Sequence, residues 1–441
     1  MQSMDGTTSI PGALAGSRPH RKRLYSSARI LLLIGLWFLA ALSVGSGQVR
    51  QIVTLEEALS LAEQYNPQLG VAGAHIQAAR AGVVTARTRP NPDVNYIGGP
   101  QNSRLPSAVT GMLQHFGYSQ MIELPKIRKT RIETAQLGQE ITERSLEETR
   151  LAVRGAVKQA FFQVLRRTEE VSLAEETLKL AQDLRQRISV QVEVGEAGRL
   201  ELTRAESEVA QAQTFLRSAQ LRQVTALAEL RAVISAPLPE QISPQAKLDA
   251  TVILPPLPEL QRLVYERHPA MARAGSEIRY SRSRLQTELA MRTPQPYWIS
   301  EYEQMPDLRF FRTGISVSLP FFNRRQGPVA EATAGVSAAT SSLSALQLEL
   351  RSSLERAYGG YQVANQQILS FEQGLLRGAQ AALDAAEAAF RFGERGIMEV
   401  LDSQRVLRTI RLDYINAQYD RQAALIELEQ LRAIDLGGNL P

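Results

Sequence analysis

The side chains that could carry out chemistry are few and widely spaced. The 441 residues include no cysteine and four histidines, His20, His75, His115 and His268. None of these histidines has a second histidine or a carboxylate at the spacing of a metal site such as H-E-x-x-H, and no nucleophile-elbow, Walker A or dinucleotide-binding motif occurs. The sequence therefore predicts no enzymatic activity, no cofactor and no metal site.

Adjacent carboxylates occur on polar segments, as in Glu147 with Glu148 and Glu175 with Glu176. Paired acids can act as general acid and base, but only where the fold brings them to a reacting group. On a polar helix, a solvated pair is the simpler interpretation. These acids do not change the expectation of a protein without catalytic chemistry.

A short glycine-containing segment occurs twice, as VEVGEAGRLEL at 192–202 and as FRFGERGIMEV at 390–400. Gly195 and Gly393, the first glycine of each copy, can adopt the positive φ that ends a helix. These two glycines lie 198 residues apart. Each segment is therefore predicted to reverse the chain between two helices.

The second glycine of each copy and a following glutamate fit the start of a returning helix. Gly198 and Gly396 free the backbone again after three residues, and Glu201 and Glu399 fall in the first turn, where the helix dipole favours a carboxylate. This structural role accounts for all four residues. An exposed hairpin tip is also suited to docking or gating, and both interpretations stay open.

Two further pairs of segments repeat in the same order. Residues 55–69 resemble 257–271, and 117–135 resemble 314–334, at offsets close to that of the glycine segments. A repeated order of segments indicates a tandem duplication. The predicted organisation is a signal peptide at 1–47, a first repeat at 48–240, a proline-rich linker at 241–256, a second repeat at 257–433 and a C-terminal tail at 434–441.

Each repeat is expected to contain a helix, two short strands, a very long helix and a returning helix. Proline breaks, RPNP and TPQP, follow the first helix of each repeat. The expected helices are 55–88, 125–191 and 200–232 in the first repeat and 257–293, 325–391 and 398–431 in the second. The expected strands are 93–97, 115–124, 297–302 and 313–320.

The returning helices carry a coiled-coil seam, with apolar or small residues at alternating steps of three and four. The seam is Leu202, Ala205, Val209, Ala212, Leu216 and Ala219 in the first repeat, and Val400, Ser403, Leu407, Ile410, Tyr414 and Ala417 in the second. Such polar helices cannot bury a core alone. They need neighbours from the other repeat and from other subunits.

The first 47 residues have the features of a secretion signal. A basic segment precedes the apolar run Ile30–Leu42, and small residues suited to cleavage follow. This run of 13 residues is short for a bilayer span of about 20. Without residues 1–47, the net charge falls from +5 to +1, because 45 basic and 44 acidic side chains remain. A nucleic-acid partner is therefore not expected.

Four short strands per chain cannot form a stable sheet alone, because the outer strands expose unpaired edges. Strands from several copies could close a barrel, the β structure that spans outer membranes. The expected fold class is mainly α with a small β part: long tandem helical hairpins, and four strands that contribute to a shared barrel.

The order of these segments resembles the TolC-type outer-membrane efflux proteins, also called outer-membrane factors. The resemblance rests on VTLEEALSLAEQYNPQL, TRPNPDVNY, ELPKIRKTRIETA and SLPFFNRRQGPVAEA together with the two glycine segments, and it covers about residues 50–435. RPNP and LPKIRKTR look most like the heavy-metal, cobalt–zinc–cadmium branch of this family.

The resemblance implies a homotrimer in the outer membrane of a Gram-negative cell, in contact with lipid. Four strands per chain would form one twelve-stranded barrel, and the long helices would form a periplasmic tunnel. The implied function is a passive exit duct for metal cations or drugs. Its implied partners are a periplasmic adaptor and an inner-membrane pump of the resistance-nodulation-division or ABC type.

The resemblance also implies roles for residues at the tips. The adaptor-docking residues are Gly195, Glu196, Gly198, Glu201, Gly393, Glu394 and Gly396. The periplasmic gate corresponds to Glu399 and Asp402, of which Glu399 replaces the aspartate of typical members. Three copies would form a ring of negative charge that attracts cations. Arg204 occupies the position of Asp402 in the first repeat, so the two hairpins would form different rings. Solvated carboxylates without a gating role are the alternative.

Two other functions fit parts of the sequence. A periplasmic adaptor or other coiled-coil interaction protein also has a secretion signal and long hairpins, but it would carry one hairpin flanked by strand-rich segments. The outer-membrane component of type I secretion would share the whole predicted fold and differ in its pump.

Overall fold

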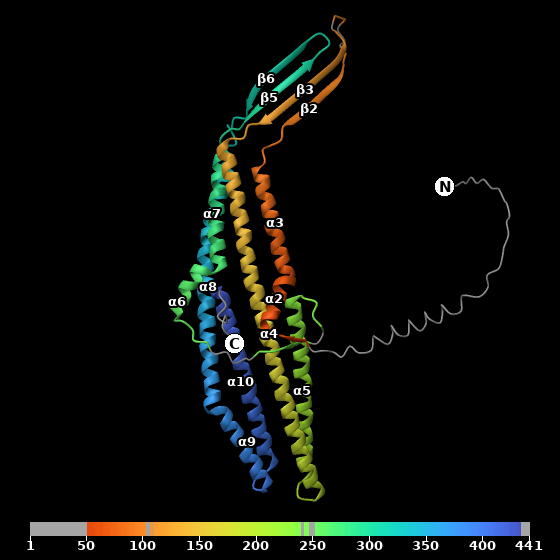
Figure 1. The fold of residues 1–441 in the computed structure, drawn as a ribbon, viewed down its shortest axis with the longest axis vertical. Coiled ribbons are helices and arrows are strands. Elements are labelled where there is room, and N and C mark those ends of the chain that lie inside the picture. Colours follow the sequence, from red (N-terminus) through yellow and green to blue (C-terminus); the bar gives the residue numbers. More distant parts are fainter. Residues whose placement is uncertain (1–50, 103–105, 108, 240–241, 247–251, 434–441) are drawn as a thin grey trace, which may run out of the picture. The chain divides into compact units, whose positions relative to one another are not determined.

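The computed structural model describes residues 51–102, 106–107, 109–239, 242–246 and 252–433. The predicted signal peptide at 1–47 and the tail at 434–441 lie outside the described residues, as does part of the predicted linker at 241–256. In the described part, helices dominate and the same order of elements occurs twice (Figure 1). The expected fold class is confirmed in this respect.

The first repeat runs from a capped helix to a long hairpin. Its elements are β1 (Gln51–Val53), α2 (Leu55–Tyr65), α3 (Pro67–Arg87), β2 (Asp93–Gln101), β3 (Gly111–Met121), α4 (Pro125–Glu193) and α5 (Arg199–Ile234). Thr54 and Glu57 form a capping box at the start of α2, with backbone-to-side-chain hydrogen bonds of 3.0 and 3.2 Å. The short strand β4 (Ile242–Pro244) pairs with β1.

The second repeat follows the same order. Its elements are α6 (Leu257–Arg267), α7 (Pro269–Ala290), β5 (Pro296–Gln304), β6 (Arg309–Val317), α8 (Gln326–Ser370), the π-helical turn η1 (Phe371–Leu375), α9 (Leu376–Arg391) and α10 (Ile397–Arg432). In both repeats, the two strands extend further toward the loop that connects them than the sequence predicted.

The prediction of one continuous first helix in each repeat is wrong. Asn66 separates α2 from α3, and His268 separates α6 from α7. Both residues have extended backbone, with ψ of 121° and 126°. The cause is the following proline, Pro67 or Pro269, which disfavours helical backbone at the residue before it and begins the next helix.

The prediction of one continuous helix at 325–391 is also wrong. The π-helical turn η1 divides this segment into α8 and α9. It contains one residue more than an α-helical turn. Its Phe371 ring packs edge-on against Tyr414 of α10, with centroids 5.9 Å apart, and the Tyr414 hydroxyl donates to Glu372 at 3.0 Å. The corresponding long helix of the first repeat, α4, is one α-helix throughout.

The four longer strands form one antiparallel sheet in the order β2-β3-β5-β6. Its register aligns one aromatic row across all strands, Tyr96, Phe116, Tyr302 and Phe311. The neighbouring row on the opposite face contains His115, Glu303 and Phe310. The sheet thus has an aromatic face and a more polar face, and β2 and β6 are its outer strands.

The helices form an open layer. Near the strands, α3 packs on α4, α4 on α7, and α7 on α8. Along the hairpins, α8 and then α9 pack on α10, while α10 packs on α4 and α4 on α5 (Figure 1). The outermost described helices are therefore α3 and α8 near the strands. Along the hairpins they are α5 on one side and α8, continued by α9, on the other.

The predicted coiled-coil seams are confirmed. Ala205, Ala212 and Ala219 of α5 are at most 1% exposed. In α10, Val400 is fully buried and Leu407 is 4% exposed. Small alanines allow α5 to approach α4 closely, which is consistent with the prediction that these helices depend on their neighbours.

Candidate functional site: the two helical tips

The first tip ends α4 with a Schellman motif. Gly195 has a φ of +80°, and its N–H donates to the Val192 carbonyl at 3.2 Å. The Glu196 N–H donates to the Gln191 carbonyl at 2.8 Å. Gly198 then has a φ of −83° and a ψ of 150° as the N-cap of α5. The predicted reversal and the positive φ at Gly195 are confirmed.

The second tip repeats this geometry. Gly393 has a φ of +72°, and its N–H donates to the Phe390 carbonyl at 3.1 Å. The Glu394 N–H donates to the Ala389 carbonyl at 2.9 Å. Gly396 is the N-cap of α10, with a φ of −80°. The two tips therefore have the same backbone and differ only in their side chains.

The acidic residues predicted for the tips lie at the starts of the returning helices. Glu201 and Glu399 occupy the first turns of α5 and α10. Arg395 Nη1 lies 2.9 Å from Glu399 Oε1 in an exposed ion pair. Asp402 is exposed one turn further along α10, and Arg204 is exposed at the corresponding place on α5. Glu399 and Asp402 thus lie on one exposed stretch of α10.

Exposed apolar side chains flank both glycine turns, and the sequence interpretation overlooked them. Val194 and Leu200 are 65% and 62% exposed at the first tip, and Phe392 and Met398 are 78% and 52% exposed at the second. The same 198-residue offset relates both pairs. That repetition of apolar residues beside glycine was the available signal.

A shared core holds the two tips together. One cluster of buried apolar residues combines Leu184 and Ile188 of α4 with Leu383 of α9 and Ile397 and Leu401 of α10. Both hairpins contribute to this cluster, so the tips form one packed end of the helical layer.

Glu208 of α5 adds a polar link above the tips. Its side chain is 9% exposed, and its carboxylate lies 3.4 Å from Arg408 and 4.0 Å from Arg405, both of α10. A carboxylate this buried is stable only beside compensating positive charge. Nothing in the sequence alone marked Glu208, because its partners Arg405 and Arg408 lie 197 and 200 residues away.

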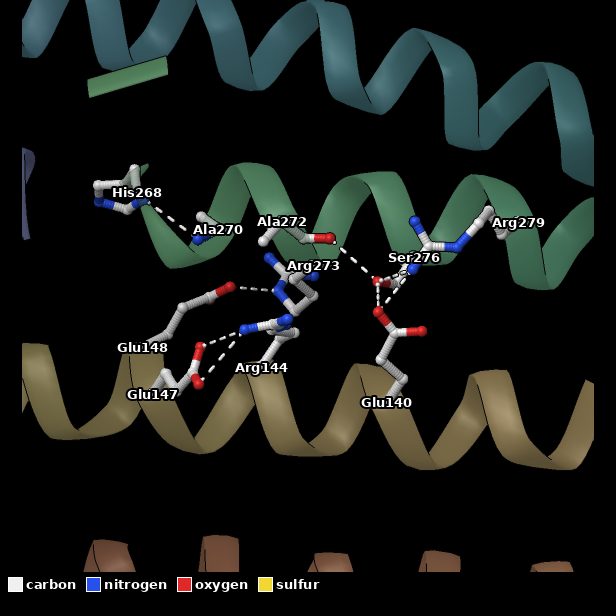
Figure 2. Close-up of polar contacts among 10 residues, drawn as sticks. All are labelled: Glu140, Arg144, Glu147, Glu148, His268, Ala270, Ala272, Arg273, Ser276 and Arg279. Atoms are coloured by element: carbon white, nitrogen blue, oxygen red, sulfur yellow. Dashed lines mark hydrogen bonds and ion pairs between the residues drawn. The ribbon is translucent and has the colours of Figure 1, made fainter. Parts of the chain in front are cut away.

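A second polar network joins α4 to α7, away from the tips (Figure 2). Arg273 Nε donates to Glu148 at 2.7 Å, and the Ser276 hydroxyl donates to Glu140 at 3.0 Å. Arg279 also binds Glu140, and this hydrogen bond lowers the pKa of the Glu140 carboxyl. The network pairs every charge that it contains, which indicates a structural link between the repeats.

Within the described ranges, no group of three or more histidine, aspartate and glutamate side chains is arranged to hold a metal ion. Among the described helices, none combines the length and the apolar character needed to cross a membrane.

Comparison with known proteins gives a family match over most of the chain. The family model described as outer membrane efflux protein matches residues 58–236 and 276–433. The chain is also 28% identical over 368 residues to the cobalt-zinc-cadmium resistance protein CzcC of Cupriavidus metallidurans, across 82% of this chain and 86% of that protein.

Solved structures share the fold. A crystal structure of CusC matches with a TM-score of 0.75 at 19% identity, over 88% of this chain and 95% of that one. The CmeC outer membrane channel of Campylobacter jejuni matches with a TM-score of 0.75 at 16% identity, over 86% and 85%. The open state of the MtrE outer membrane channel of Neisseria gonorrhoeae matches with a TM-score of 0.72 at 18% identity, over 87% and 89%.

Proposed function

The chain belongs to the outer membrane efflux protein family, and from this premise we propose that three copies form a passive exit duct across the outer membrane. The strands of the copies close one barrel, and their helical layers close one periplasmic tunnel. An inner-membrane pump supplies the energy for export, and a periplasmic adaptor connects this pump to the duct.

The observation that carries this proposal is the sheet with an aromatic face and two unpaired outer strands. The exposed side chains on that face include Tyr96, Phe116, Trp298 and Phe311, which are 46–68% exposed. Aromatic residues that face outward are typical of barrels in lipid, whose interior face is polar. A barrel also removes the open edges of β2 and β6, because each edge pairs with the next copy.

The two tips are the docking sites for the adaptor in this proposal. Each tip presents one exposed apolar side chain before its first glycine and one after its second, next to Glu196 or Glu394. An exposed apolar pair beside charge is typical of a surface that becomes buried in a complex. Three copies would present six such tips, two from each chain.

Glu399 and Asp402 form the gate in this proposal. Both are exposed on α10 within two turns of the second tip, where the tunnel would be narrowest. Three copies bring these carboxylates into a ring that concentrates cations at the entrance. The first tip does not repeat this ring, because the position of the first repeat that corresponds to Asp402 is occupied by Arg204.

Divalent metal cations are the proposed cargo. This assignment follows from the relative CzcC, whose name describes cobalt, zinc and cadmium resistance. Deleting the gene should therefore raise sensitivity of the host to these metals more than to drugs. Equal metal sensitivity with increased drug sensitivity would contradict the metal assignment and leave the duct in place.

Membrane fractionation of the full chain tests the duct itself. The mature protein should be recovered with outer membranes as a trimer that persists in mild detergent, and it should conduct ions in planar bilayers. Recovery as a soluble periplasmic monomer would refute the proposal and favour an adaptor-like interaction protein.

A further inference from the structure

Positive charge is concentrated where the helices join the sheet. The segments that connect them are 87–93, 122–129, 291–295 and 318–325. Together they hold two acidic residues, Asp93 and Glu123, and eight basic residues: Arg87, Arg89, Lys126, Arg128, Lys129, Arg292, Arg324 and Arg325. The chain without residues 1–47 has a net charge of only +1, so its remaining part is net negative. The loops at the opposite end of the sheet, 102–110 and 305–308, hold one base and one acid.

Two arginines at this level hold the connections together. Arg131 Nη1 lies 2.6 Å from Glu123 Oε1, and the Arg131 side chain also donates to backbone carbonyls at the end of α3. Arg325 Nε donates to Glu288 of α7 at 3.0 Å. These two arginines are paired inside the chain, and so neither is available to a ligand.

Three other bases are unpaired. Lys126, Lys129 and Arg324 are exposed, and no ion pair involves them within the part of the chain that the structure describes. An open hollow of about 510 Å³ lies on α4 beside Lys129. Its lining is mixed, with the acid Glu133 at the end away from the sheet: Pro125, Arg128, Lys129, Ile132, Glu133 and Gln136.

At its upper end, the segment after β6 lies level with the start of α4. Val317, the last residue of β6, is paired with Pro296 of β5. The Pro296 carbonyl in turn accepts a hydrogen bond from the Ile122 N–H at 2.8 Å. The ends of β6 and β3 are therefore at the same height, two strand spacings apart.

At its lower end, the same segment lies level with the third turn of α4. Arg325 binds Glu288 of α7, and the neighbouring Thr287 has its hydroxyl oxygen 3.3 Å from that of Thr134 in α4. Residues 318–324 therefore run down beside the turns of α4 that carry the unpaired lysines, directly below the sheet (Figure 1).

This segment also extends the apolar face of the sheet. The side chains at alternate positions are 43–70% exposed: Ile315, Val317, Leu319 and Phe321. The residues between them are Ser316, Ser318 and Pro320. Phe322 follows and is 96% exposed. The apolar face thus ends in two adjacent exposed phenylalanines, and Arg324 comes two residues later.

The length of β6 places these phenylalanines at the membrane surface. Its nine residues extend about 30 Å, and at the strand tilt typical of barrels they span about 23 Å. The apolar band of a barrel is about 25 Å tall, so the strand occupies all of it. The residues after β6, on the side of the helices, therefore fall in the headgroup layer of the periplasmic leaflet.

We propose that Phe321, Phe322, Arg324, Lys126 and Lys129 form a binding surface for phospholipids with anionic headgroups, such as phosphatidylglycerol, in the periplasmic leaflet. The proposal rests on the proposed barrel and names a lipid partner for it. The phenylalanine rings enter the boundary of the acyl chains, and the three bases contact the headgroup phosphates. Each base near an anionic membrane surface favours binding about fivefold.

A second copy of the chain is the alternative cover for this surface, and charge disfavours it. In the proposed barrel, the edge of β6 pairs with β2 of the next copy. That copy would bring its connection 87–93, with Arg87 and Arg89 against one acid, next to Arg324. Like charges repel across such a contact, whereas an anionic headgroup attracts both sides.

Fluorescence quenching by brominated lipid tests the contact. The two tryptophans of the chain are Trp37, in the predicted signal peptide, and Trp298. Trp298→Phe/Phe322→Trp leaves one tryptophan in the mature protein, and phosphatidylglycerol brominated on its acyl chains should quench the fluorescence in reconstituted bilayers. The matched control is Trp298→Phe/Phe392→Trp. Phe392 is 78% exposed at the second tip, far from the sheet, and its replacement should not be quenched.

The same tryptophan measures the preference for a headgroup. Vesicles contain either brominated phosphatidylglycerol in unbrominated phosphatidylcholine or brominated phosphatidylcholine in unbrominated phosphatidylglycerol, at one mole fraction of brominated lipid. Quenching should show at least about a tenfold preference for phosphatidylglycerol. Adding Lys126→Gln/Lys129→Gln/Arg324→Gln should reduce this preference to about one.

The matched control for charge removes three exposed bases from the first hairpin, as Lys179→Gln/Arg187→Gln/Arg217→Gln. The preference should then be unchanged. All variants should persist as trimers in mild detergent, which shows that each is folded.

The outcomes separate this inference from the proposed function. A trimer that conducts ions but shows no quenching at the Phe322→Trp position would overturn the inference, because protein then covers this residue, and would leave the duct intact. Equal quenching by the two lipids, or a preference that survives the loss of the three bases, would overturn it as well. Recovery of the natural chain as a soluble periplasmic monomer would refute both proposals.

Discussion

Asn66 and His268 occupy the same point in the two repeats and cap equivalent helices with different chemistry. The Asn66 side-chain oxygen accepts a hydrogen bond from the Gln68 N–H at 2.9 Å, and His268 Nδ1 accepts one from the Ala270 N–H at 3.1 Å. An imidazole accepts at Nδ1 only when it is neutral. Burial lowers the pKa of His268, which favours this neutral form.

The His268 cap should make stability depend on pH. Because the pKa is lower in the folded chain than its ordinary value of 6.5, the contribution is complete above pH 6.5 and is lost as the pH falls through the folded value. His268→Asn should keep the cap, as Asn66 does, and remove this slope. Thermal unfolding between pH 8 and about 5 measures the difference. If stability changes equally with pH in the two proteins, the pKa of His268 is the same in the folded and the unfolded chain, and the cap does not depend on pH.

The two glycines with positive φ should respond to substitution differently from the two N-cap glycines. Gly195→Ala or Gly393→Ala should destabilise its tip by about 1–2 kcal/mol, because a Cβ disfavours left-handed backbone. No neighbouring atom lies within 4 Å of a Cβ built at either position, so backbone strain alone produces the effect. Hydrogen exchange at the tips measures it.

The matched controls for these variants are Gly198→Ser and Gly396→Ser. They add a Cβ where φ is −83° and −80°, again with no atom within 4 Å, and serine is a good N-cap. Tip exchange should be unchanged or slower. Equal acceleration in both sets of variants would mean that the positive φ is not the cause.

The tips were predictable from sequence because their geometry depends on local residue types. Gly195 and Gly393 determine where the chain reverses, whatever surrounds them. Pro67 and Pro269 also mark the helix breaks in the sequence, because a proline disfavours helical backbone at the residue before it. The π-helical turn at Phe371–Leu375 has no comparable signal. It is stabilised by contacts with Tyr414, which only the fold brings near.

Buried charge was the least predictable feature. Glu170 of α4 has a side chain only 3% exposed, with Arg167 at 2.7 Å, Arg166 at 3.3 Å and Arg222 of α5 at 3.5 Å. From the sequence, Glu170 is one acid among many on a polar helix. Its burial follows from the packing of α5 and α10 on α4, which no local pattern specifies.

Glu170→Gln should therefore destabilise the helical layer. The three arginines would lose their common carboxylate, and breaking a buried charge network of this kind costs about 3 kcal/mol. Glu147→Gln is the matched control, because Glu147 and its partner Arg144 are 47% and 41% exposed. That variant should lose at most about 1 kcal/mol. Denaturant unfolding followed by circular dichroism compares them, and equal losses would contradict a special role for Glu170.

The two carboxylates proposed for the gate should contribute unequally to cation block, because their surroundings differ. Arg395 already compensates part of the charge of Glu399 at 2.9 Å, whereas no ion pair involves Asp402 within the described part of the chain. Asp402→Asn should therefore weaken block by added divalent cations in planar bilayers more than Glu399→Gln does, and the double variant should weaken it most. Glu201→Gln, at the corresponding place in the first repeat, should leave block unchanged and serves as the control. If the double variant conducts normally and is blocked at the same cation concentration as the natural protein, neither carboxylate lines the constriction, and both are solvated residues of α10.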